Sequence, residues 1–159
     1  MSGVRIRPLR RCEEDPIREL YAHLSPRSRY LRFFSAMPVL PDAVVRQLAC
    51  VDGRRSVALV AEARVGDRAD VVGLASYGAI DERTVELGLV VRDEWQRQSI
   101  GTELATRVLE MAEARGFHRF VASIHSHNVA IRRLLLKIGI VVSATFEGGV
   151  SEIVFVRQP

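Results

Sequence analysis

The sequence predicts an α/β (α+β) domain built on a mixed central sheet, with an antiparallel N-terminal half and helices that flank the sheet. Two patterns lead to this prediction. Between residues 56 and 91, apolar and polar residues alternate with period two, which is typical of strands joined by short turns. Before and after this region, apolar residues recur every three or four positions, which is typical of amphipathic helices.

The N-terminal region predicts one strand followed by three helices. Val4–Arg7 alternates apolar and basic residues and is expected to form the strand. Asp15 and Pro16 suit the first turn of a helix. An acidic side chain there interacts favourably with the positive end of the helix dipole, and proline is tolerated because first-turn N–H groups have no partner within the helix. The other two helical segments, each preceded by a proline, are expected over Arg27–Phe34 and Asp42–Cys50.

Turn and cap residues set the expected boundaries of the later elements. Gly66 and Asp67 suit a turn between two strands, and Asn128 suits the N-cap of a helix. Gly116 and Gly139 stand where helices should end. Strands are expected at Val57–Ala63, Val71–Ile80, Thr84–Val91, Phe120–Ile124, Val141–Phe146 and Ile153–Val156, and the long helix at Ile100–Arg115.

Size, composition and charge limit the classes of protein. The 159 residues suit one domain over residues 1–159, and 48% apolar with 26% charged residues is ordinary for a packed core. No apolar run approaches the ~20 residues of a membrane span, and no secretory signal is seen, so we expect a cytoplasmic protein without membrane partners. A net charge of +4 suits a phosphorylated cofactor, whereas scattered arginines and only 6% aromatic residues argue against a nucleic-acid-binding module.

The cysteines and histidines do not indicate a metal site. Cys12 and Cys50 belong to no CxxC pair or Cys/His cluster, and in the cytoplasm both are expected to be reduced thiols. His125 and His127 lack a third acidic or thiol ligand nearby, so we interpret them as loop residues and predict no metal.

The segment from Val90 to Thr102 carries the strongest chemical signal. It joins a strand to the start of an amphipathic helix, where several backbone N–H groups and the helix dipole together favour a bound anion such as a pyrophosphate. Gly101 permits close approach of the backbone to a ligand, and Arg92 and Arg97 add positive charge.

Within this segment, Gln96–Gly101 resembles the Q/R-x-x-G-x-G/A motif with which the GNAT superfamily of N-acetyltransferases grips the pyrophosphate of acetyl-CoA. Asn128 and the helix ending in Lys137 and Gly139 resemble a second motif of the family. The resemblance covers essentially the whole chain and implies the GNAT fold, acetyl-CoA as co-substrate and an amine acceptor. The residues implied in cofactor binding are Leu89, Val90, Val91, Gln96, Arg97, Gln98, Ser99, Ile100, Gly101, Thr102 and Asn128.

The segment Leu24–Ser35 resembles the start of the catalytic domain of bacterial Pat-type protein lysine acetyltransferases. This resemblance implies a protein lysine as acceptor and Glu86 as general base. A lysine-type amine with a pKa of ~10.4 must lose a proton before attack, and a carboxylate can accept it directly or through a water. The alternative to a catalytic role is that Glu86 is a strand residue that faces solvent.

Two positions depart from the family motifs. Ser99 stands where the first motif glycine is expected, which costs about 1 kcal/mol if the backbone there needs a positive φ. Leu135 stands where many members carry a tyrosine that protonates the leaving thiolate. The broken alternation at Val90 and Val91 suggests a β-bulge that frees an N–H for the oxyanion, as in other GNAT folds.

Several alternatives stay open at this stage. The acceptor is either a protein lysine or a small amine such as a polyamine, an aminoglycoside or an amino acid. Ser99 and Leu135 also allow a module that binds acyl-CoA without turnover. Tyr30–Phe34 either lines the acceptor cleft or packs in the interior. The sequence leaves the oligomeric state unknown, with a dimer possible.

Overall fold

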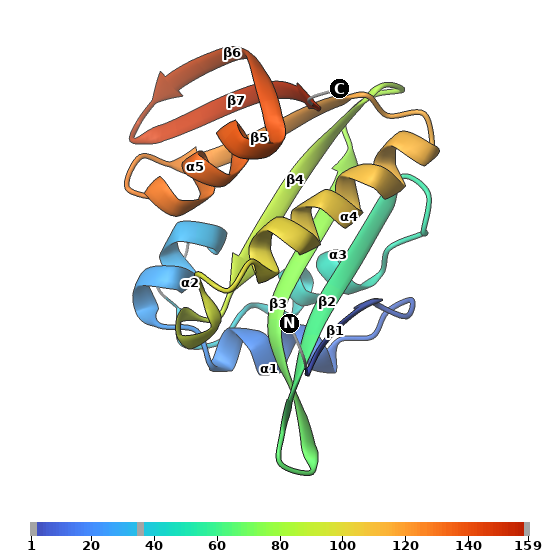
Figure 1. Cartoon of the computed structure of the whole chain (residues 1–159), viewed down its shortest axis with the longest axis vertical. Helices are drawn as coiled ribbons and strands as arrows, with labels where there is room; N and C mark the ends of the chain where they lie inside the picture. Colours follow the sequence, from blue (N-terminus) through green and yellow to red (C-terminus); the bar gives the residue numbers. More distant parts are fainter. Residues whose placement is uncertain (1–2, 35–36, 158–159) are drawn as a thin grey trace.

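One seven-stranded sheet organises the chain (Figure 1). The structure is a computed structural model and describes residues 3–34 and 37–157. The described helices include none that is both long enough and apolar enough to cross a membrane. The strands are β1 (Val4–Pro8), β2 (Ser56–Val65), β3 (Arg68–Ala79), β4 (Thr84–Val91), β5 (Arg119–His125), β6 (Gly139–Glu147) and β7 (Val150–Arg157). The helices are α1 (Asp15–Ala22), α2 (Pro26–Phe33), α3 (Asp42–Ala49), the short 3₁₀ helix η1 (Asp93–Trp95), α4 (Ile100–Ala114) and α5 (Val129–Ile138).

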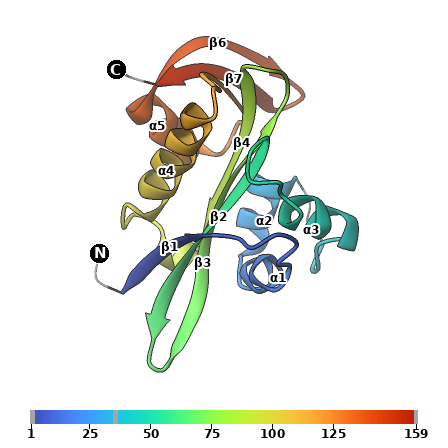
Figure 2. The ribbon, with the colours of Figure 1, turned by 90° about the vertical axis from the view of Figure 1, so that its right-hand side faces the viewer.

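The sheet is mixed, as the sequence predicts. The strand order is β1-β2-β3-β4-β5-β7-β6, and β1 to β4 form an antiparallel meander. β4 and β5 run parallel, because α4 crosses over between them, and β5, β7 and β6 are again antiparallel. Helices α1, α2 and α3 lie on one face, and α4 and α5 lie on the other (Figure 2).

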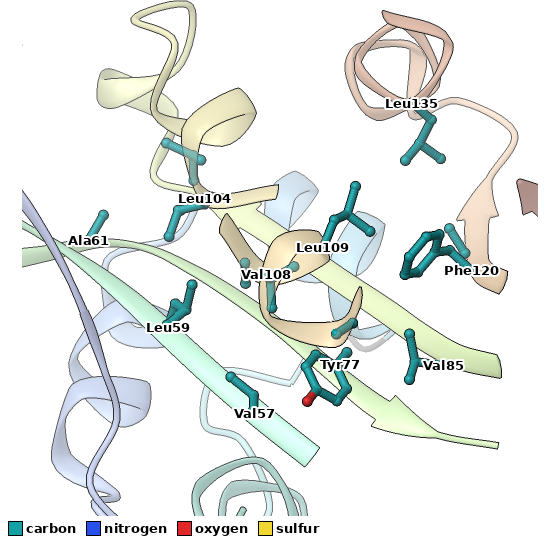
Figure 3. Packing of buried hydrophobic residues seen from close by; sticks show 14 of the residues in the cluster. Val57, Leu59, Ala61, Tyr77, Val85, Leu104, Val108, Leu109, Phe120 and Leu135 are labelled. Atoms are coloured by element: carbon teal, nitrogen blue, oxygen red, sulfur yellow. The ribbon is translucent and has the colours of Figure 1, made fainter. Parts of the chain in front are cut away.

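The two faces of the sheet bury separate apolar clusters. Under α4, Leu104, Val108 and Leu109 pack against strand residues such as Val85 and Phe120 (Figure 3). The opposite cluster joins α1 and α3 to the strands. Each fully buried side chain of this kind contributes roughly 1.5–3 kcal/mol, so the two layers fix where the ends of β4 lie. Members of the second cluster include Ile17, Leu20, Val45, Val60, Leu74 and Val90.

The last two strands, β6 and β7, begin two and three residues earlier than the sequence predicts. β6 begins at Gly139, directly after α5, because Gly139 is extended (φ −142°) rather than left-handed. A side chain at Gly139 would lie 2.5 Å from the Phe155 ring, so this junction requires glycine. β7 begins at Val150, because Gly148 and Gly149 supply the positive φ values of a tight turn after β6.

The expectation of reduced thiols is wrong, because Cys12 and Cys50 form a disulfide. The N–H of Cys12 donates to the Ala49 carbonyl at 2.8 Å, which brings the β1–α1 connection against the end of α3. A separation of 38 residues matches no local cysteine motif, so only the tertiary contact reveals the pair.

Candidate active site

The two parallel strands at the centre of the sheet separate soon after they meet. β4 pairs with β5 only from Thr84 to Glu86, opposite residues Arg119 to Val121. Beyond that point β4 stays paired with β3 as far as Val91, while β5 continues beside β7. A slot therefore opens along one edge of β4, beginning at Glu86.

The slot exposes backbone donors of β4. The N–H of Arg92 donates to the Val72 carbonyl at 2.8 Å, so the even-numbered residues of β4 direct their N–H groups toward β3. By the alternation of an antiparallel ladder, Leu89 and Val91, which lie beyond the last β4–β5 pair, direct theirs into the slot.

The predicted β-bulge at the end of β4 is therefore wrong. The described register between β3 and β4 runs without a shift from Val85 to Val91. The alternation breaks because Val90 is buried among the α1–α3 cluster while Val91 is buried under α4. The free N–H groups arise instead from the departure of β5.

One cavity of about 640 Å³ lies between the end of β4 and the N-termini of α4 and α5. Five cationic side chains line it: Arg27, Arg32, Arg97, Arg133 and Lys137. This charge and the α4 N-terminus suit a phosphorylated ligand. The lining also includes Leu89, Val90, Val91, Gln96, Ser99, Gly101, Thr102 and Asn128.

Three other residues expected at this site lie elsewhere. Gln98 is exposed, and Ile100 is buried in the core under α4, so their side chains stand outside the cavity lining. Arg92 is buried beside β3 and donates to Glu94 at 2.8 Å. Its charge is thus taken up by that ion pair.

The loop before α4 has the backbone that its glycine motif requires. Ser99 has φ +67° and Arg97 has φ +63°, both in the left-handed region. Ser99 makes no side-chain cap bond to α4. Gly101 serves packing, because a side chain there would lie 3.3 Å from Leu134 on α5. Ser99 therefore holds a conformation that costs about 1 kcal/mol without glycine.

Asn128 caps α5, as the sequence predicts. Its Oδ1 accepts a hydrogen bond from the Ile131 N–H at 3.3 Å. Asn128 also lines both cavities of the site, so its side chain lies where they meet.

A second cavity of about 550 Å³ opens at the start of the slot. Glu86 lies in it with an exposed side chain, and the Ser123 Oγ donates to its Oε2 at 3.4 Å. Leu135 also lines this cavity but is 4% exposed, so the wall of the cavity at this position is apolar.

Arg32 of α2 reaches across this second cavity to β4. A side chain at Gly88 would lie 2.2 Å from its Nη2 and 2.6 Å from its Cζ, so the guanidinium fills the space that Gly88 leaves. Its Nε is shielded from solvent and has no hydrogen-bond partner in the described part of the chain. Of the segment Tyr30–Phe34, Arg32 therefore lies at the cavity, and the sequence signal for this placement is Gly88, two positions after Glu86 on the same strand face.

An anchor holds α2 against the connection between β4 and α4. Asp93 accepts hydrogen bonds from the Ser25 N–H at 3.2 Å, the Ser25 Oγ at 2.9 Å and the Ser28 Oγ at 3.0 Å. Partial burial acts to raise the pKa of Asp93, but the hydrogen bonds from Ser25 and Ser28 outweigh it and lower the pKa. The anchor fixes the start of the helix that carries Arg32.

Residues 4–141 match the family described as acetyltransferase (GNAT) domain, so the chain belongs to the GNAT acetyltransferases. It is an acetyltransferase that uses acetyl-CoA and an amine acceptor. The charge of the 640 Å³ cavity, which five cationic side chains line, is complementary to the phosphates of this co-substrate. The described residues hold no group of three His, Cys, Asp or Glu side chains suited to a metal ion.

Two kinds of curated relative are similar to this chain. Acetyltransferase PA5475 of Pseudomonas aeruginosa is 28% identical over 139 residues, which cover 87% of this chain and 75% of that protein. An L-methionine sulfoximine/L-methionine sulfone acetyltransferase of Pseudomonas paraeruginosa is 37% identical over 81 residues, 46% of each chain.

Solved structures share the fold. The GNAT domain of S. lividans PAT has a TM-score of 0.83 at 23% identity, covering 96% of this chain and 90% of that one. The putative acetyltransferase yncA of Salmonella typhimurium, solved with acetyl-CoA, has a TM-score of 0.74 at 22% identity, covering 99% and 94%.

Proposed function

We propose that this enzyme acetylates a primary amine by direct attack, with Glu86 as the general base. The separation of β4 from β5 carries the proposal, because it leaves Glu86 at the mouth of a slot lined by free backbone N–H groups. Acetyl-CoA supplies the activated acetyl group as a thioester. Glu86 would take the proton from the attacking amine as the C–N bond forms and the C–S bond breaks.

The remaining steps are assigned to the backbone of β4 and to the cationic cavity. The N–H of Leu89 would donate to the acyl oxygen, where negative charge develops during attack. The loop around Ser99, together with Arg97, would hold the phosphates. Leu135 offers no proton to the leaving thiolate, and the ordinary thiol pKa of ~8.5 makes such a donor dispensable.

Two acceptor classes remain, and different observations support them. The resemblance of the α2 segment to Pat-type enzymes supports a protein lysine. The name of the L-methionine sulfone acetyltransferases supports a small molecule, although the similarity covers 46% of each chain.

The test compares Glu86→Gln with Glu110→Gln, which removes an exposed carboxylate of α4 that lines neither cavity. Calorimetry would measure acetyl-CoA binding, and thiol release would measure turnover with a mixed panel of amines. We expect Glu86→Gln to lower turnover about 10²- to 10⁴-fold while acetyl-CoA binds as before. Unchanged turnover would remove Glu86 from this role.

A further inference from the structure

Arg32 lines both the 640 Å³ cavity and the 550 Å³ cavity that contains Glu86, which we call the acceptor cavity. None of the ion pairs and hydrogen bonds of the described residues involves its guanidinium, whose Cζ lies 4.8 Å from the centroid of the Phe33 ring. Burial lowers the pKa of Arg32 to about 10, while the nearby Glu86 carboxylate acts to raise it, so the group stays cationic at neutral pH. An unpaired buried donor of this kind is costly unless a ligand satisfies it.

Arg32 and Glu86 are neighbours that do not pair. Arg32 fills the space above Gly88, two residues along the same strand face from Glu86, which corresponds to about 6.6 Å along the strand. One positive and one negative group thus face the same small volume, each with hydrogen-bonding capacity left over. This arrangement is complementary to a zwitterion whose ammonium and carboxylate are close together.

We propose that Arg32 binds the carboxylate of the acceptor, and that the acceptor is a free amino acid whose α-amine is acetylated. This proposal rests on the role of Glu86 proposed above, because Glu86 would receive the amine while Arg32 holds the carboxylate on the adjacent carbon. The planar guanidinium matches a carboxylate with two parallel N–H donors. A lysine side chain in a protein carries no carboxylate near its amine and would leave Arg32 unpaired.

The experiment measures kcat/KM for the twenty free L-amino acids and L-methionine sulfone, together with a lysine-containing peptide and spermidine. The best amino acid is then compared with its own α-carboxamide, in which a neutral group of similar shape replaces the carboxylate. We expect the acid to exceed the amide by about 10- to 100-fold, the range for a charged hydrogen bond.

Two variants test whether Arg32 causes the preference for the acid over the amide. Arg32→Gln should lower kcat/KM for the acid by the same factor and leave the amide unchanged. Gly88→Ala keeps the charge but displaces it, since the three nearest atoms to the added carbon all belong to Arg32, and it should reduce the preference too. Arg46→Gln, which removes an exposed cation of α3, is the matched control and should change neither substrate.

Each other outcome overturns the proposal in a distinguishable way. Equal losses for acid and amide in Arg32→Gln would mean that Arg32 acts on the fold or on the thioester rather than on the acceptor. Acetylation of the peptide or of spermidine but of no amino acid would refute this inference and leave the role of Glu86 intact. Acetyl-CoA binding without acetylation of any acceptor would contradict both proposals.

Discussion

The cofactor cavity, of about 640 Å³, and the acceptor cavity, of about 550 Å³, share lining residues that include Arg32, Leu89 and Asn128, and they differ in how the chain builds them. Much of the cofactor cavity comes from the continuous stretch between Leu89 and Thr102, where a strand end, a loop and a helix start supply backbone donors. The acceptor side draws Arg32 from α2, Glu86 from β4 and Ser123 from β5, which are far apart in sequence. A ligand held by backbone leaves a local sequence motif, whereas one held by dispersed side chains does not.

The largest expected effect on stability comes from the Cys12–Cys50 disulfide, which joins the β1–α1 connection to the end of α3 beside the acceptor cavity. Reducing the Cys12–Cys50 disulfide, which closes a loop of 38 residues, should lower the free energy of unfolding by about 4 kcal/mol. Because α3 lines the acceptor cavity and not the cofactor cavity, acetyl-CoA affinity should stay unchanged below the melting temperature.

Thermal unfolding with and without reductant would measure this effect, and Cys12→Ser with Cys50→Ser should lose the response to reductant. Equal melting temperatures in both conditions would show that the pair does not stabilise the fold in solution.

A smaller effect is expected at the anchor between the two cavities. Asp93→Ala removes acceptors for Ser25 and Ser28 and should lower the free energy of unfolding by about 1–2 kcal/mol. Since the folded-state pKa of Asp93 is lowered, its stabilisation is present above the unfolded pKa of ~3.9 and is lost as pH falls through the folded pKa.

Denaturant unfolding of wild type and Asp93→Ala between pH 7 and pH 3 would check this. The difference in free energy of unfolding between the two proteins should become smaller toward pH 3. A difference that does not change with pH would argue against an ionised Asp93 carboxylate in the anchor.

The smallest effect belongs to the cofactor loop. Ser99→Gly should raise the free energy of unfolding by up to about 1 kcal/mol, because glycine adopts φ +67° without a Cβ penalty. The loss of a side chain that makes no cap bond should not offset this gain. Chemical denaturation gives the stability, and acetyl-CoA calorimetry on the same variant tests whether the serine contributes to binding. A destabilised variant would mean that the Ser99 hydroxyl makes a stabilising contact.

The sequence by itself determined the elements whose signals are local. The helical stripe of α4, the Asn128 cap and the turn at Gly66 depend on neighbouring residues and on side-chain periodicity, so they could be predicted with their approximate boundaries. The loop before α4 could also be located, since a strand end followed by a helix start creates an anion site within one short segment.

The tertiary structure decided the features that depend on residues distant in sequence. The disulfide, the separation of β4 from β5 and the reach of Arg32 to Gly88 have no local signature. The broken alternation at Val90 illustrates the reason, because burial on both faces of a strand and a β-bulge produce the same pattern of apolar residues. Only the packing of helices on both faces distinguishes them, and that packing is fixed by contacts across the whole chain.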